Sequence, residues 1–408
     1  MSVTKYTGIL ALLILFSACS KDNQEKVNLL PEASEKADII RNENNAFGLK
    51  LFKELNAKRD GSQNVVISPL STAMVLGMAY NGTAGATREE FSEILGWDMV
   101  NLDQLNRYNR SLIDHLHQES GNIRMSISNS VWFNKRLNIN ADFLKRNREN
   151  FQAFSSAIDN ETQSASKLIN RWVAQSTNDK IKRVVDEVST SDMLYILNAT
   201  YFKGNWKNKF NESKTTETQF HLEDGTSKPV RMMWQKADLN YFDGDRFQLV
   251  ELPYENENYC MYILLPDDDI KLDLLIGELN YTSWHENKKK LSLKRNINFG
   301  MPRFHCEHAV QMQELLAGMG LEKLFSNKST NLSGITGKQV AISEMMHKAA
   351  IDVDEKGTEA SAATSVAISF TTLVEDDPFN LIINRPFVFA IEEKQSNTLL
   401  FIGKISRP

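Results

Sequence analysis

The sequence predicts an α+β fold in a single domain that spans residues 41 to 408. Helical periodicity dominates the first part of the chain and strand patterns dominate the later part. This order favours an α+β fold over a doubly wound one. No linker, low-complexity segment or internal repeat interrupts the pattern from Asn44 onward. Strand patterns spread over so much uninterrupted sequence favour one domain over several.

The composition is that of a globular protein with a sizeable core. Hydrophobic residues make up 41% and charged residues 24% of the 408 residues, with only 9 prolines. The formal net charge of -5 is mild, and there is no long basic block. A nucleic-acid partner is therefore not predicted.

Residues 1 to 18 are predicted to be a signal peptide. They contain Lys5, an apolar run from Ile9 to Phe16, and two small residues before Cys19. The segment resembles the lipobox of bacterial lipoproteins, although Phe16 stands where that motif usually has leucine. The resemblance implies a lipid on Cys19, secretion across the inner membrane and anchoring in the outer membrane, with a polar tether over residues 19 to 40. A plain signal peptide with an incidental cysteine is the alternative.

Helices are expected in the first half of the chain. Phe47, Leu51 and Leu55 recur at helical spacing, and residues 164 to 177 carry an apolar stripe of Leu168, Trp172 and Val173. A further helix is predicted over 69 to 80, with Ser68 as N-cap, Pro69 at the first helical position and Asn81-Gly82 as the stop. The residues from Thr87 to Glu90 match a capping box that would open the next helix.

Strands are expected in the second half. The apolar runs that predict them cover residues 194–202, 247–254, 259–265, 291–304 and 340–353, followed by a hairpin of 386–391 and 398–405. Cys260 and Cys306 lie inside such runs and are predicted to be buried free thiols; a single disulfide between them is the alternative.

The chemistry of an enzyme is not found. The sequence has no G-x-S-x-G elbow, no H-E-x-x-H, no phosphate-binding glycine loop and no dinucleotide fingerprint. The cluster from His305 to His308 is interpreted as the end of a strand rather than as a zinc site. His347 is interpreted as a hydrogen-bonding residue of the core rather than as a catalyst. We therefore expect no enzymatic activity, no metal and no cofactor.

Residues 355 to 370, EKGTEASAATSVAISF, combine two conflicting patterns. Thr358, Ala360, Ala362 and Thr364 alternate with their neighbours as on one face of a strand. The residues that flank the alternating part, Glu355 to Gly357 before it and three acidic residues after it, are typical of an exposed loop. The sequence thus has the side-chain pattern of a strand where an exposed loop is predicted.

This segment resembles the hinge of the reactive-centre loop of serpins. The matching residues are Glu355, Gly357, Thr358, Glu359, Ala360, Ala362, Ala363 and Thr364. Other blocks agree with the family in order along the chain: NVVISPLSTAMVLGMAYNGTAGATREE at 64–90, ISNSVWFNK at 127–135, ILNATYFKGNWKNKF at 196–210, FGMPRF at 299–304 and NRPFVFAIEEKQSNTLLFIGKISRP at 384–408. The resemblance covers essentially everything after residue 41.

The resemblance implies a fold of about nine helices and three mostly antiparallel sheets, with an exposed reactive-centre loop at about 355 to 379. It also implies a monomer that inhibits proteases by suicide: the protease cleaves the loop, is held as an acyl-enzyme, and is trapped when the loop inserts into the main sheet as an extra strand, which is established for serpins. Alternatives are a non-inhibitory serpin and a structural or binding lipoprotein of the envelope.

The usual family register places the reactive bond between Thr371 and Thr372, with Phe370 and Leu373 as alternatives because the following segment is longer than in many serpins. Thr371 suits an elastase-like protease, whereas Phe370 or Leu373 suits a chymotrypsin-like one. No Lys or Arg lies between Gly357 and Phe379, which disfavours trypsin-like targets. Papain-like cysteine proteases remain a further target class.

Five further residues match positions with named roles in serpins. Ser68, Ser71, Asn198 and His347 match the shutter, a polar network beneath the sheet where it opens. Trp206 matches the breach, where the loop first enters the sheet.

Overall fold

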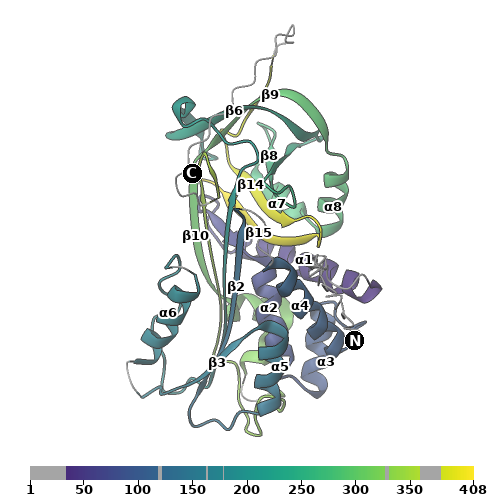
Figure 1. The fold of residues 1–408 in the computed structure, drawn as a ribbon, viewed down its shortest axis with the longest axis vertical. Helices are drawn as coiled ribbons and strands as arrows, with labels where there is room; N and C mark the ends of the chain where they lie inside the picture. The colour runs from purple at the N-terminus through teal and green to yellow at the C-terminus, as the bar shows by residue number, and fades with distance from the viewer. Residues whose placement is uncertain (1–33, 118–121, 162–163, 178, 327–329, 359–377) are drawn as a thin grey trace, which may run out of the picture.

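The computed structural model describes residues 34–117, 122–161, 164–177, 179–326, 330–358 and 378–408. Within these residues it confirms the predicted α+β class, with helices and two sheets arranged along one long axis (Figure 1). The α-helices of the described chain are α1 (Glu35–Ala57), α2 (Pro69–Tyr80), α3 (Gly85–Ile94), α4 (Leu102–Leu116), α5 (Ala141–Phe151), α6 (Ser164–Ser176), α7 (Leu272–Glu278), α8 (Tyr281–Lys289) and α9 (Met312–Leu316).

Most of the strands follow the helices in the chain, as predicted. They are β1 (Val65–Ile67), β2 (Arg124–Asn134), β3 (Phe154–Ile158), β4 (Leu194–Asn205), β5 (Thr216–His221), β6 (Ser227–Asp243), β7 (Phe247–Pro253), β8 (Tyr259–Pro266), β9 (Ser292–Pro302), β10 (Phe304–Gln311), β11 (Glu344–Val353), β12 (Gly357–Thr358), β13 (Phe379–Ile382), β14 (Phe387–Glu393) and β15 (Thr398–Ile405).

The central sheet has six strands in the order β10-β11-β12-β4-β2-β3. It is mixed, because β11 runs parallel to β4 and β2 runs parallel to β3, while the other neighbours are antiparallel. Helix α6 covers one face through Ile169 and Val173. Helix α2 packs against the opposite face, over β2, β4 and β11 (Figure 1). The sheet is therefore buried on both faces.

The second sheet has nine strands and lies at one end of the molecule (Figure 1). Two of the three expected sheets are continuous within it, because the 17-residue β6 pairs with β5 and β9 along its first part and with β7 and β9 along its second. The predicted strand over 291–304 is divided at Arg303, so that β9 belongs to this sheet and β10 to the central one.

Helix α2 is capped as predicted. Ser68 is its N-cap and accepts a hydrogen bond from the backbone N–H of Ser71 at 3.0 Å, and Pro69 occupies the first position. The predicted capping box at Thr87 is wrong, because α3 begins at Gly85 and no side chain caps it. The Thr87 hydroxyl instead accepts from the backbone N–H of Asn331 at 2.9 Å. A tertiary contact has taken the place of the local one.

One boundary and one buried stripe differ from the expectation. Helix α1 begins at Glu35 with Ser34 as N-cap, and Ile40 is buried, so folded chain extends into the predicted tether of residues 19 to 40. In α6 the buried stripe contains Ile169 and Val173, whereas Leu168 is exposed. None of the helices in the described chain is both long and apolar enough to cross a membrane.

Candidate functional site

The start of the hinge segment lies inside the central sheet. Gly357 and Thr358 form β12, which enters between β11 and β4 at one end: Thr358 pairs with Val353 on one side and with Gly204 on the other. Thr358 is only 1% exposed. The prediction that the chain becomes an exposed loop at Glu355 is therefore wrong, since Glu355 and Gly357 are buried as well.

Gly357 is required by the close approach of another strand. A Cβ atom at this position would lie 2.0 Å from the carbonyl oxygen of Gly204 and 2.7 Å from the Cα of Asn205. Both neighbours are backbone atoms of β4, which cannot rotate away as a side chain can. A glycine is thus the residue that lets β12 reach the edge of β4.

Trp206 holds the turn that leads into β12. Its indole N–H donates to the carbonyl oxygen of Asp354 at 3.0 Å, and its backbone N–H donates to the carbonyl oxygen of Lys356 at 2.9 Å. Its ring stacks on Tyr254 with 4.6 Å between centroids. The structure thus places Trp206 where the segment enters the sheet.

Glu355 anchors the same turn from the other side. Its carboxylate accepts from the guanidinium of Arg303 at 2.6 and 2.8 Å and from the hydroxyl of Thr215, and its side chain is 2% exposed. Burial by itself would raise the pKa of Glu355, but the hydrogen bonds from Arg303 and Thr215 outweigh it and hold the pKa below its ordinary value. Glu355 is therefore ionised in the folded protein.

We expect Glu355→Gln to lower the stability of the intact protein by about 1 to 2 kcal/mol, because it removes the charge from a buried, doubly hydrogen-bonded acceptor. This expected loss of stability is at the low end for buried ion pairs because Arg303 is half-exposed. Thermal unfolding at pH 7 measures the effect. Glu307→Gln, which removes the exposed partner of Lys348 on β10, is the control. Equal midpoints for the two variants would contradict the anchoring role.

Beyond β12, the described residues of β4 and β11 are first not paired with each other and then pair directly. Tyr195 to Ala199 of β4 pair with Glu344 to Lys348 of β11, so each β4 residue faces the β11 residue numbered 149 higher. Gly204 and Val353, which both pair with Thr358, also differ by 149. In the described chain no pairing joins residues 200–203 to residues 349–352. The gap is therefore a stretch of four residues on each strand, and both of its ends have the same register.

The side chains predicted for the shutter lie on one hydrogen-bonded chain across the sheet. The backbone N–H of Ser68 donates to Nε2 of His347 at 2.9 Å, and Ser68 Oγ accepts from the backbone of Ser71. From Ser71 the chain continues through the side chains of Thr200, Asn198 and Asn129 to the carbonyl oxygen of Phe151. It joins β11, α2, β4 and β2, and His347 directly faces Asn198 in the closed part of the sheet.

His347 is fully buried and neutral. Burial, together with the nearby His308, lowers the pKa of His347 to about 3. A neutral ring is what its contact requires, because Nε2 accepts the hydrogen bond from Ser68 and must be unprotonated. The interpretation of His347 as a hydrogen-bonding residue of the core agrees with this geometry.

Glu344 lies at the first pair of the closed part, beside Tyr195. Burial, followed by the charges of Asp192 and Asp186, raises the pKa of Glu344 to about 7, and a hydrogen bond from Gln311 opposes this. The hydroxyl of Tyr195 in turn donates to Asp192. A carboxyl with a raised pKa binds its proton more tightly in the folded state, so folding is favoured below the ordinary pKa near 4.5 and loses this contribution as the pH rises to about 7.

We expect Glu344→Gln to raise the thermal midpoint of the intact protein at pH 8 and to lose this advantage as the pH is lowered toward 5. The amide has the shape of the carboxyl without its charge, so the gain exists only where Glu344 is ionised. Unfolding of both proteins between pH 5 and 8 measures the difference. Asp352→Asn, at an exposed carboxyl on the same strand, should show no such trend; a pH-independent difference for Glu344→Gln would refute the prediction.

The His305 to His308 cluster is a strand, as interpreted from the sequence. His305 and Glu307 face solvent, whereas Cys306 and His308 face inward. His308 lies 3.0 Å from the guanidinium of Arg59, and burial followed by the charge of Arg59 lowers the pKa of His308 to about 4. Over the described ranges no group of three or more His, Cys, Asp and Glu side chains is arranged to hold a metal ion. Cys260 and Cys306 are both buried and free, as predicted.

Several predicted site residues lie outside the described residues. They are Cys19 of the lipid anchor, the hinge residues Glu359, Ala360, Ala362, Ala363 and Thr364, and the residues around the reactive bond, Phe370, Thr371, Thr372 and Leu373. The described site thus contains the base of the predicted loop and the sheet into which it leads.

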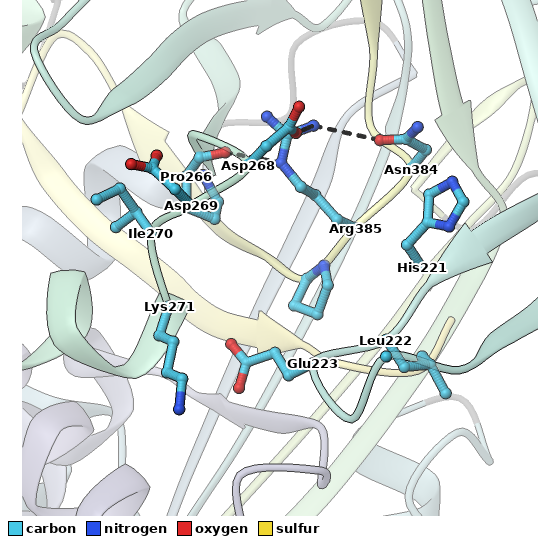
Figure 2. Close-up of a pocket in the computed structure, with 12 residues that line it drawn as sticks. His221, Leu222, Glu223, Pro266, Asp268, Asp269, Ile270, Lys271, Asn384 and Arg385 are labelled. Carbon is cyan, nitrogen blue, oxygen red and sulfur yellow. Dashed lines mark hydrogen bonds and ion pairs between the residues drawn. The ribbon is translucent and has the colours of Figure 1, made fainter.

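A pocket of about 540 Å³ lies beside the segment that follows β13 (Figure 2). Arg385 spans it, donating through Nε to the carbonyl oxygen of Pro266 at 2.8 Å and pairing with Asp268 at 3.1 Å. The carbonyl oxygen of Asn384 accepts from the backbone of His221 at 2.8 Å. These contacts fix the chain downstream of the predicted loop to the turn between β8 and α7 and to the end of β5.

Sequence reasoning missed Tyr254, Thr215 and Arg303, which bind Thr358 and Glu355. Arg303 lies in the block FGMPRF, and its position at the change from β9 to β10 was the available signal. Thr215 and Tyr254 lie in unremarkable sequence. Only the fold brings them to the hinge.

Comparison with known proteins identifies the family. A family model described as serpin (serine protease inhibitor) matches residues 42–408. A leukocyte elastase inhibitor of Xenopus laevis is 32% identical over 373 residues, which cover 89% of this chain and 97% of that protein. An uncharacterized serpin-like protein of Thermococcus kodakarensis is 32% identical over 387 residues, 94% of this chain and 88% of that protein.

A solved structure agrees with this result. The thermophilic serpin tengpin in its native state is 27% identical, with a TM-score of 0.83 over 91% of this chain and 94% of that one. The expectation of no enzymatic activity is corrected to a positive statement, because the matching family is one of serine protease inhibitors. Since the family model covers far more than half of the chain, the protein belongs to the serpin family.

Proposed function

We propose that the protein is a suicide inhibitor of serine proteases that acts as a monomer and traps its target by inserting its cleaved loop into the central sheet. The observation that carries this proposal is the position of β12. The hinge already pairs with both β11 and β4, and beyond it, over the described part of the chain, these two strands are not paired with each other for four residues.

The register of the sheet supports insertion without rearrangement along the strands. The residue numbers of paired β4 and β11 positions differ by 149 on both sides of the gap. A strand that continues β12 would therefore be in register with both neighbours. The strands β11 and β4 need only move apart sideways. In this register Ala360 would lie between Phe202 and Ile351, and Ala362 between Thr200 and Ala349.

The side chains of the segment suit that position. Thr200, Phe202, Ala349 and Ile351 are all buried on the inner face of the sheet, so residues inserted beside them must be small and uncharged. The alternation in the sequence supplies Ala360 and Ala362 on this face and Glu359 on the other. At roughly 3.3 Å per residue, the arm from Gly357 to Thr371 would carry its end close to 50 Å.

The chemical step is an interrupted hydrolysis. The serine hydroxyl of the protease would attack the carbonyl carbon of Thr371, the peptide bond to Thr372 would break, and the amine of Thr372 would leave with a proton. The loop would then be joined to the protease as an ester. Insertion would move this ester away from the site where water attacks, so that the covalent complex persists.

The target class we propose is elastase-like or chymotrypsin-like, with papain-like cysteine proteases as a further class. Thr371 fits a small pocket, and Phe370 or Leu373 fits a larger apolar one. Relatives at 31 to 32% identity carry the name leukocyte elastase inhibitor, which supports the first choice.

The test is to mix the purified protein with elastase, chymotrypsin and trypsin and to analyse each mixture on a denaturing gel. We expect a covalent adduct with elastase or chymotrypsin, and N-terminal sequencing of the released fragment should begin at Thr372 or within about two residues of it. Cleavage of the loop without an adduct would identify a non-inhibitory serpin. An uncleaved loop would favour a structural role.

We further propose that the mature chain is anchored by a lipid on Cys19 in the outer membrane of a bacterial envelope, where the inhibitor would protect its owner from foreign proteases. The support is the sequence of residues 1 to 19. A labelled fatty acid should be incorporated into the protein in cells and should be absent from the Cys19→Ala variant. Labelling that persists in this variant would refute the anchor.

A further inference from the structure

Tyr254 places its side-chain hydroxyl against the hinge strand β12. Tyr254 follows β7, is fully buried, and its hydroxyl lies 2.6 Å from Oγ1 of Thr358. Burial raises the pKa of Tyr254, so the hydroxyl keeps its proton and can donate. The contact joins Thr358 of β12 to the residue that directly follows β7.

The ring of Tyr254 is held in a fixed position. It stacks on Trp206 at 4.6 Å and meets Phe202 edge to face at 5.0 Å between centroids. Its backbone N–H donates to the carbonyl oxygen of Tyr259 at 3.0 Å. The hydroxyl therefore points to one place, and that place is the position of Thr358 when β12 lies in the sheet.

The backbone alone gives β12 few contacts. The strand has two residues: Gly357 pairs with Asn205, and Thr358 pairs with Val353 and Gly204. The N–H and C=O groups of Gly357 also bond within the turn, to Oδ1 and the backbone N–H of Asp354. For so short a strand, the docked and undocked positions differ little in free energy. The entropy lost on ordering its residues is about as large as the free energy that their hydrogen bonds contribute. Trp206 and Glu355 hold the turn before β12, and at Thr358 itself the buried hydroxyl pair favours the docked position.

We propose that Tyr254 is a positioning residue that docks Thr358 between β4 and β11 and so starts the insertion of the loop. This inference rests on the proposed function for its consequence and on the geometry of Tyr254 and Thr358 for its cause. Insertion competes with hydrolysis of the acyl-enzyme. A hinge that is docked less often inserts more slowly in proportion to the docked fraction, and more protease escapes.

The first experiment needs no protease. Hydrogen exchange of the peptide that contains Gly357 and Thr358 is compared in the intact parent, Tyr254→Phe and Tyr259→Phe. We expect exchange about two- to tenfold faster in Tyr254→Phe, the factor that corresponds to the net value of one hydrogen bond. Tyr259 is the matched control, because it is also buried against Phe202 but lies on β8. Unchanged exchange in Tyr254→Phe would overturn the inference.

The second experiment measures the fate of the protease. Tyr254→Phe should leave the rate of loop cleavage unchanged and raise the ratio of cleaved inhibitor to covalent adduct by about two- to tenfold. Thr358→Val should have the same effect, the double variant no more than either single one, and Thr358→Ser should behave as the parent because it restores the hydroxyl. Additive effects in the double variant would show that the two hydroxyls act separately and would overturn the inference.

The two proposals fail in distinguishable ways. If the parent forms no adduct with any protease, the proposed inhibition fails, and the hydrogen-exchange comparison still decides whether Tyr254 docks the hinge. If the parent forms the adduct and Tyr254→Phe partitions as the parent does, inhibition stands and the role of Tyr254 is refuted.

Discussion

Cleavage within the segment 359–377 is expected to raise the thermal midpoint of the protein by about 10 to 20 °C. Among the residues that the structure describes, 200–203 of β4 are not paired with 349–352 of β11, whereas the outer edges of both stretches are paired with β2 and β10. Alternate residues of a strand direct both their N–H and C=O groups to one side, so about eight backbone groups face the gap. Pairing these groups with an inserted strand is the reason for the expected rise in the thermal midpoint.

Filling the gap would pair those groups. At about 1 kcal/mol for each net hydrogen bond, the gain is about 8 kcal/mol, provided that the inserted residues offset the entropy of their own ordering by their burial and their remaining bonds. At about 2 °C for each kcal/mol, the midpoint moves by the amount stated. The intact state would then be a kinetic trap, and the energy that moves the protease would come from pairing these strand edges.

The measurement is calorimetry of intact protein and of protein cleaved in the loop, at the same pH and salt. Protein incubated with inactivated protease is the control for handling. A cleaved form that melts no higher than the intact form would contradict the stored-energy mechanism, and with it the proposed function.

Thr358→Arg is expected to convert the protein from an inhibitor into a substrate. Thr358 is buried against Tyr254, and its partners in the sheet are Val353 and Gly204. A guanidinium at this position would lose its water without gaining an anionic partner, which costs several kcal/mol. The hinge would stay outside the sheet, insertion would become more than about a hundredfold slower, and the protease would complete hydrolysis.

The readout is the fraction of protease found as covalent adduct, which should fall from most of the protease to almost none while cleavage of the loop continues. Glu359→Arg is the matched control, because in an inserted strand alternation would direct residue 359 to the opposite side. The thermal midpoint of the uncleaved variants should remain near that of the parent. An unchanged stoichiometry of inhibition in Thr358→Arg would refute the assignment of the hinge.

Much of the fold was predictable because it follows from local rules. The strand runs at 194–202, 247–254, 259–265 and 398–405 were found by their apolar character, and α2 by its cap at Ser68 and its proline. These signals arise within a few residues of chain. The start of α3 was not predictable, because the hydroxyl of Thr87 binds the distant backbone of Asn331 instead of capping its own helix.

The sequence by itself determined that residues 355 to 370 carry a strand pattern in a place where a loop was expected, and which face of that strand is small. The alternation of side chains depends only on backbone geometry. Tertiary structure alone decided where that strand begins: Glu355 and Thr358 are buried because Arg303, Thr215 and Tyr254, from other parts of the chain, supply their hydrogen-bond partners. It also decided that β4 and β11 share one register above and below an open gap, since pairing between strands about 149 residues apart is set by the packing of the whole sheet and not by any local pattern.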